Sequence, residues 1–92
     1  MKEALIPEAE WRERAACLPY PAILFFGMDE NEAAPERHAR EEEAKSICLH
    51  CIVRAECLDY ALTTRESYGI WGGLTPSQRK AFRKRQRRAS LA

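Results

Sequence analysis

Four cysteines constrain this chain more than any other feature of its sequence. Cys48, Cys51 and Cys57 fall in one short stretch, while Cys17 comes from far along the chain. This uneven spacing favours a single inorganic site on which all four thiols converge. A chain of 92 residues buries only a modest core, so the binding energy of a metal group would contribute to its folding.

The sequence gives no indication of export or of a membrane anchor. The first residues contain no apolar signal-peptide segment, and no apolar run approaches the roughly 20 residues that span a bilayer. We therefore expect a cytoplasmic location without membrane association. Disulfides are uncommon in that compartment, which favours metal or redox chemistry for the cysteines.

The apolar pattern predicts an all-α fold, a small helical domain of about four helices organised around the four-cysteine site. Residues 7–17, 35–51, 54–65 and 75–90 show helical signals, and no segment shows the period-2 alternation of a strand. In the last of these segments Thr75 is the expected N-cap and Gln78 its capping-box partner. Residues 18–34 contain prolines, a glycine and acidic side chains, so we expect a loop there.

Charge is strongly segregated along the chain. Residues 1–66 carry 8 Lys and Arg against 14 Asp and Glu, whereas residues 67–92 carry 7 basic residues and no acid. We expect one domain over 1–92, with a body at about 11–73 and a basic helix or tail at about 75–92. The basic segment could be a solvated helix end, but its charge favours contact with DNA phosphates. The candidate DNA-binding residues are Arg79, Lys80, Arg83, Lys84, Arg85, Arg87 and Arg88.

The spacing of the four cysteines does not decide which metal they bind. Zinc takes four thiolates, but its usual signature has two CxxC pairs and this chain has one. An iron–sulfur cluster also takes four cysteines and is larger, so it tolerates uneven spacing. Four unligated buried thiols are the plainest alternative. His38 and His50 are expected at the surface, because four thiolates complete either site.

The combination of motifs in this chain resembles that of a known protein family. Cys17, the run CLHCIVRAEC, the turn GIWGG and a basic C-terminal helix resemble the WhiB-like proteins of actinobacteria and their phages. The resemblance covers about Trp11 to Arg88. It implies a [4Fe-4S] cluster held by the four cysteines and a role in transcription regulation, with oxygen or nitric oxide as the signal. One departure is Ile52, where members often have proline.

The resemblance also implies partners: the C-terminal domain of the principal sigma factor, in RNA polymerase, and DNA. The protein would be a monomer that forms a heterodimer with the sigma factor. Trp71 and the two phenylalanines could instead be core residues that pack near the cluster. The expected sigma-factor contacts are Trp71, Gly69, Ile70, Gly72, Gly73, Phe25 and Phe26.

Two other function classes remain. Without the metal, Cys48 and Cys51 could form a disulfide and act as a thiol–disulfide oxidoreductase, although the βαβ context of such motifs is missing. The protein could also be a zinc-stabilised adaptor. The sequence contains no Ser-His-Asp set, phosphate-binding glycine loop or acid pair, so we expect no catalytic residues and no enzyme.

Overall fold

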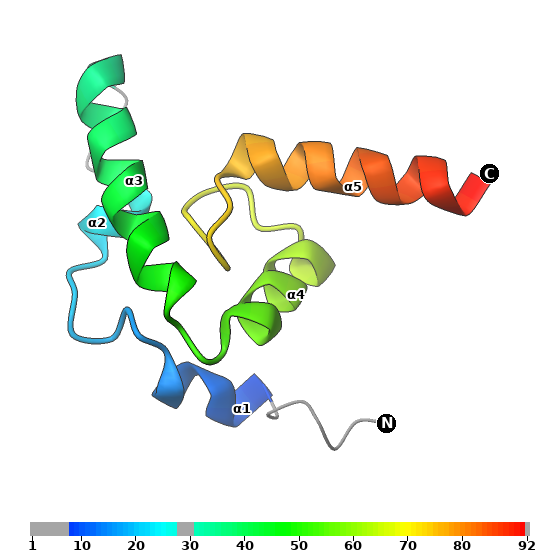
Figure 1. The fold of residues 1–92 in the computed structure, drawn as a ribbon, viewed down its shortest axis with the longest axis horizontal. Coiled ribbons are helices and arrows are strands. Elements are labelled where there is room, and N and C mark those ends of the chain that lie inside the picture. The colour runs from blue at the N-terminus through cyan, green and yellow to red at the C-terminus, as the bar shows by residue number, and fades with distance from the viewer. Residues whose placement is uncertain (1–7, 28–30, 92) are drawn as a thin grey trace.

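The computed structural model describes residues 8–27 and 31–91. A short helix α1 (Glu8–Trp11) continues as the 3-10 helix η2 (Arg12–Arg14), and another short helix follows, α2 (Ile23–Phe26). Three longer helices complete the chain: α3 (Ala34–Leu49), α4 (Arg54–Thr64) and α5 (Pro76–Leu91) (Figure 1). The described residues form no strand, only an isolated bridge between Trp71 and Leu74, so the all-α prediction is confirmed.

Local signals explain where the longer helices begin and end. The amide of Thr75 donates to Oε1 of Gln78 at 2.9 Å, and the amide of Gln78 donates to Oγ1 of Thr75 at 3.2 Å. This is the predicted capping box, with Pro76 as the first residue of α5. Helix α4 ends at Thr64, and the capping residue Arg65 has a left-handed φ of 57°, which turns the chain away.

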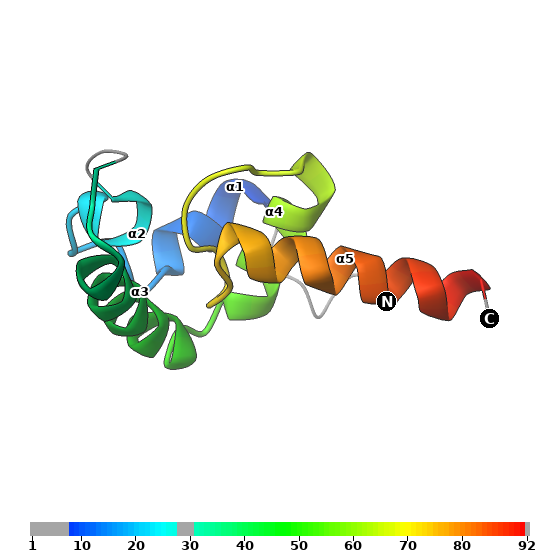
Figure 2. The same ribbon diagram turned by 90° about the horizontal axis from the view of Figure 1, so that it is seen from above.

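The helices form an angular body from which α5 projects. In Figures 1 and 2, α1 lies beside α4, α2 lies beside α3, and the C-terminal half of α5 extends away from the other helices. The predicted loop at 18–34 is wrong in one respect, because this segment contains α2. None of the helices described is long and apolar enough to cross a membrane.

The apolar core lies where α2, α3 and the segment before α5 meet. Phe25, Ala44, Cys48 and Ile70 are buried together there. The amide of Ile70 donates to the carbonyl of Phe25 at 3.0 Å, which joins α2 to the glycine-rich segment. A core this small buries little apolar surface, so the body depends strongly on polar contacts as well.

One arginine side chain fastens α2 to α3. Arg40 on α3 binds the carboxylate of Glu32 through Nε at 2.8 Å and Nη2 at 3.0 Å. Its Nη1 donates to the carbonyl of Leu24 at 3.1 Å. The guanidinium therefore holds the C-terminal end of α2 and the chain entering α3 at the same time.

A buried arginine organises the irregular segment that precedes α5. Arg79 has no exposed surface. Its Nη1 donates to the carbonyls of Gly69 and Leu74 at 2.8 and 2.9 Å, and its Nη2 donates to those of Glu66 and Tyr68 at 3.0 and 3.3 Å. Backbone carbonyls of a non-helical segment need partners when they are buried, and this side chain supplies them.

This geometry corrects one sequence-based expectation. The sequence predicts that Arg79 contacts DNA, but its guanidinium is enclosed and already occupied by carbonyl oxygens. It therefore belongs to the core of the protein and not to its basic surface.

We expect Arg79→Gln to lower the stability of the protein by about 2–3 kcal/mol, because buried carbonyls would lose charge-assisted hydrogen bonds. For a domain of this size the loss corresponds to roughly 10 °C or more in Tm, measured by circular dichroism without air. Lys80→Gln removes the neighbouring, exposed charge and should leave Tm nearly unchanged. An equal effect of the two substitutions would contradict this role of Arg79.

Candidate metal centre

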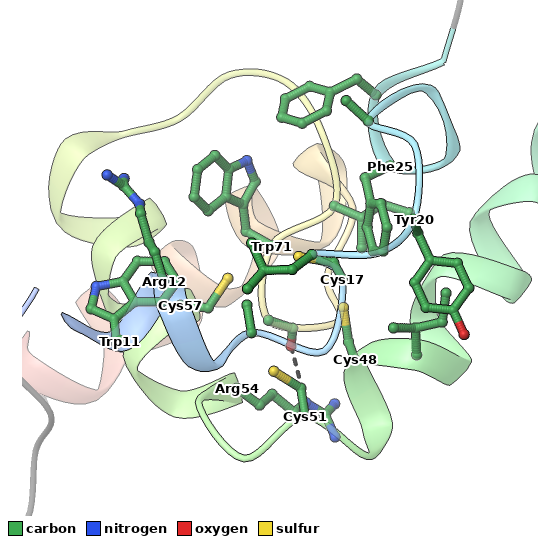
Figure 3. A pocket seen from close by; sticks show the side chains of 17 residues that line it. Trp11, Arg12, Cys17, Tyr20, Phe25, Cys48, Cys51, Arg54, Cys57 and Trp71 are labelled. Atoms are coloured by element: carbon green, nitrogen blue, oxygen red, sulfur yellow. Dashed lines mark hydrogen bonds between the residues drawn. The ribbon is translucent and has the colours of Figure 1, made fainter. Parts of the chain in front are cut away.

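The four cysteines come from four different places in the fold and line one cavity. Cys17 lies in the turn after η2, Cys48 in the last turn of α3, Cys51 in the α3–α4 connection and Cys57 in the first turn of α4. The cavity has a volume of about 320 Å³ and is otherwise lined mainly by apolar and aromatic side chains. Figure 3 shows the four thiols around this space.

The four thiols line the cavity, but they do not meet at a single point. Within the described part of the chain, no three Cys, His, Asp or Glu side chains are placed to hold a single metal ion. Four cysteines around one space are a donor set that fits an iron–sulfur cluster, in which each thiolate binds a different iron. His38 and His50 are exposed and do not line the cavity.

The apolar surroundings disfavour free thiolates. Burial raises the pKa of Cys48 and, to about 12, that of Cys57. Burial and the neighbouring Cys51 also raise the pKa of Cys17, although that residue is exposed overall. Negative charge on these sulfur atoms therefore requires compensation, which a metal group or hydrogen-bond donors can provide.

Backbone amides supply part of that compensation. The backbone amides of Gly73 and Gly72 face Cys48 and Cys57, and this interaction acts to lower the pKa of these two thiols, against the larger effect of burial. The amide of Ala16 donates to the sulfur of Cys51 at 3.4 Å. Such N–H···S contacts stabilise charge on the sulfur atoms of iron–sulfur sites.

Glycines are required in the turn that carries two of these amides. Trp71 and Leu74 exchange backbone hydrogen bonds of 3.2 and 3.0 Å, so Gly72 and Gly73 form the two-residue loop of a minimal hairpin. Both have positive φ, 59° and 84°, as a type I′ turn demands. A Cβ on Gly72 would lie 2.5 Å from the Cβ of Leu58 on α4, so the turn packs directly on that helix.

A row of aromatic rings runs beside the cavity. Trp11, Tyr60 and Trp71 follow one another with centroid separations of 5.9 and 5.5 Å, and Phe26 meets Trp71 edge-on at 6.3 Å. Arg12 lies over the Tyr60 ring at 4.4 Å. The row connects α1, α4, the glycine-rich turn and α2, which ties the walls of the cavity together.

The expected sigma-factor contacts divide into buried and exposed residues. Phe25 is only 6% exposed and belongs to the core, which is the alternative that the sequence leaves open. Phe26 is 51% exposed, and Trp71 is half-buried with its indole N–H bound to the carbonyl of Tyr68. The remaining four expected contacts are buried: Gly69, Ile70, Gly72 and Gly73.

Sequence reasoning missed Tyr68, which is 77% exposed beside this turn. Its position directly before GIWGG was the available signal. Arg12 and Arg54 were also missed, although both line the cavity and are its only charged lining residues in the described part of the chain.

The basic residues of α5 are mostly exposed. Arg83 is half-buried, and Arg85 lies near the ring of Phe82, 5.8 Å from its centroid. The exposed members of the predicted DNA-binding set are Lys80, Lys84, Arg85, Arg87 and Arg88. They lie on the helix whose C-terminal half projects from the body (Figure 2), and none of them lines the cysteine cavity.

Fold and site together define a small all-α protein with a four-cysteine centre and a separate basic helix. A family model described as "Transcription factor WhiB" matches residues 11–82. The chain belongs to this family, as its cysteine and glycine motifs indicated.

Curated relatives agree with this assignment. The chain is 45% identical to the transcriptional regulator WhiD of Streptomyces coelicolor over 90% of its own length and 73% of that protein. It is 39% identical to the transcriptional regulator WhiB of the same organism, over 91% and 92% of the two chains. It is 41% identical to the redox-responsive transcriptional regulator WhiB3 of Mycolicibacterium smegmatis, over 88% and 83%.

Proposed function

We propose that the protein is a transcriptional regulator whose four cysteines bind a [4Fe-4S] cluster. The convergence of Cys17, Cys48, Cys51 and Cys57 on one apolar cavity is the observation that carries the proposal. When bound, the cluster supplies a redox-active, oxygen- or nitric-oxide-reactive group. The chain contributes the thiolates, the amides that face them and the aromatic walls that limit access of water.

The geometry argues against the two alternatives. A zinc adaptor would need thiolates closer to one point than the described residues provide. A dithiol oxidoreductase needs a thiol with a depressed pKa, typically at a helix N-terminus. Cys48 instead lies in the last turn of α3, where the helix dipole disfavours a thiolate, and burial raises its pKa.

Replacing any one of the four cysteines by Ser should abolish or severely reduce iron retention and much of the helical order, because the cross-link that joins four segments is broken. Iron content, visible absorbance and circular dichroism of protein prepared without air provide the measurement. His50→Ala, beside Cys51 but exposed, is the matched control and should keep its iron. A Cys17→Ser protein with a full iron complement would refute the assignment.

The aromatic surface beside the cavity is the proposed contact with the C-terminal domain of the principal sigma factor. Phe26, Tyr68 and Trp71 present exposed ring surface, and the edge-on contact of Phe26 with Trp71 keeps two of the rings in fixed orientations. Rigid aromatic side chains typically contribute most of the binding energy of an interface. Because Phe26 and Trp71 also line the cavity, the cluster would support this surface from behind.

Tyr68→Ala should weaken binding to the sigma-factor domain by about 2 kcal/mol and leave the cluster intact, because the side chain does not line the cavity. Affinity can be measured by calorimetry without air. Ile52→Ala removes a similarly exposed apolar side chain, 74% exposed, from the α3–α4 connection and should bind normally. Equally weakened binding in the two variants would place the interface elsewhere.

Helix α5 is the proposed DNA contact. Its exposed basic side chains have no acidic residue on the same helix. The C-terminal half of α5 projects from the body, where it is accessible to a phosphate backbone (Figure 2). Contacts of this kind add affinity without reading sequence. Promoter choice would then come mainly from the sigma factor and the polymerase that the protein joins.

Neutralising Lys84, Arg87 and Arg88 to Gln should reduce DNA affinity equally on all sequences. The slope of log affinity against log salt should become shallower by about 0.9 for each phosphate that the variant no longer neutralises. Arg37→Gln, an exposed charge change on α3, is the control for net charge. A reduced affinity for one sequence only would mean that these residues read bases.

A further inference from the structure

The Gly72–Gly73 turn has an orientation that its own sequence does not determine. Two glycines can form either a type I′ or a type II′ hairpin loop, and the two forms differ by rotation of the central peptide. The observed φ of 84° at Gly73 identifies the type I′ form. A contact from outside the turn can therefore add to the preference for this orientation.

Arg54, the first residue of α4, makes such a contact. Its Nε donates to the carbonyl of Gly72 at 3.0 Å (Figure 3). Its guanidinium also packs on the turn, since a Cβ on Gly73 would lie 3.0 Å from Nη2. The carbonyl of Gly72 and the amide of Gly73 belong to the same planar peptide, so fixing one fixes the other.

We infer that Arg54 is a positioning residue for the metal centre, which holds the Gly72–Gly73 peptide with its N–H directed at the sulfur of Cys48. The inference rests on the proposed cluster for its redox consequence, but the turn geometry stands on the contact itself. An N–H···S bond stabilises the reduced, more negatively charged cluster and so raises its reduction potential. If the peptide rotates, this donor turns away and the carbonyl replaces it.

Three substitutions separate the hydrogen bond from the charge. Arg54→Gln places an amide N–H where Nε stood but removes the charge. Arg54→Lys keeps the charge without a donor at that position, and Arg54→Met removes both. Because Arg54 is exposed overall, these variants should still fold. Arg12→Gln is the control, since Arg12 lines the same cavity and stacks on Tyr60 instead of holding the turn.

The measurement is the reduction potential of the cluster in protein prepared without air, with iron content as the check on loading. We expect Arg54→Lys and Arg54→Met to shift the potential to more negative values. A tenfold fall in the reduced-to-oxidised ratio at fixed solution potential, about 59 mV for one electron, is the expected scale. Arg54→Gln should lower the reduction potential no further than Arg12→Gln does. The Arg12→Gln variant measures the effect of removing a nearby charge alone.

The opposite ranking of reduction potentials would overturn the inference. If Arg54→Lys had the wild-type potential, and Arg54→Gln and Arg12→Gln lowered it equally, only the charge of the arginine would matter.

A second measurement does not depend on the cluster. The nuclear Overhauser effect between the amide protons of Gly72 and Gly73 is strong in the type I′ form and weak in the rotated form. If the wild-type protein held no cluster, the proposed function would be wrong. The nuclear Overhauser effect would still show whether Arg54 determines the type of the turn. An unchanged effect in Arg54→Met would refute the role of Arg54.

Discussion

The structure depends on the burial of the Arg79 guanidinium among backbone carbonyls of residues 66–74. That segment has no helix and no strand to satisfy its polar groups, yet Gly69, Ile70, Gly72 and Gly73 within it are buried. A single cation with several donors can satisfy carbonyls that point in different directions. With the segment fixed in this way, the glycine-rich turn is presented to α4 and to the sulfur atoms, and α5 leaves the body at a defined angle.

The cavity combines two opposing requirements. Partial burial among its aromatic and apolar walls raises the pKa of three thiols and makes free thiolates costly. The amides of Ala16, Gly72 and Gly73 partly offset that cost by facing the sulfur atoms. A bound cluster would complete the compensation, so retention of the group and integrity of the fold are coupled through the same contacts.

The proposed activities occupy separate parts of the molecule. The cysteine cavity and the exposed aromatic rings share the body, where removal of a cluster would be felt directly by Phe26 and Trp71. Five basic side chains of α5 are exposed, whereas Arg79 is buried and Arg83 half-buried. The C-terminal half of this helix projects from the other helices (Figures 1 and 2). A change at the cysteines would therefore act directly on the proposed partner surface, whereas the proposed phosphate contacts lie on another element.

The helical class, the capping box that starts α5, the four cysteines and the family can all be predicted from the sequence, because local periodicity, cap chemistry and motif spacing are properties of neighbouring residues. The sequence could not separate Arg79 from the other basic residues of α5, since only the packing of residues 66–74 around that side chain makes it a core residue. It could not divide Phe25 from Phe26, because a helix of four residues, docked by the Ile70–Phe25 hydrogen bond, sends adjacent rings in different directions. The role of Arg54 likewise depends on a contact 18 residues away, which only the tertiary structure brings together.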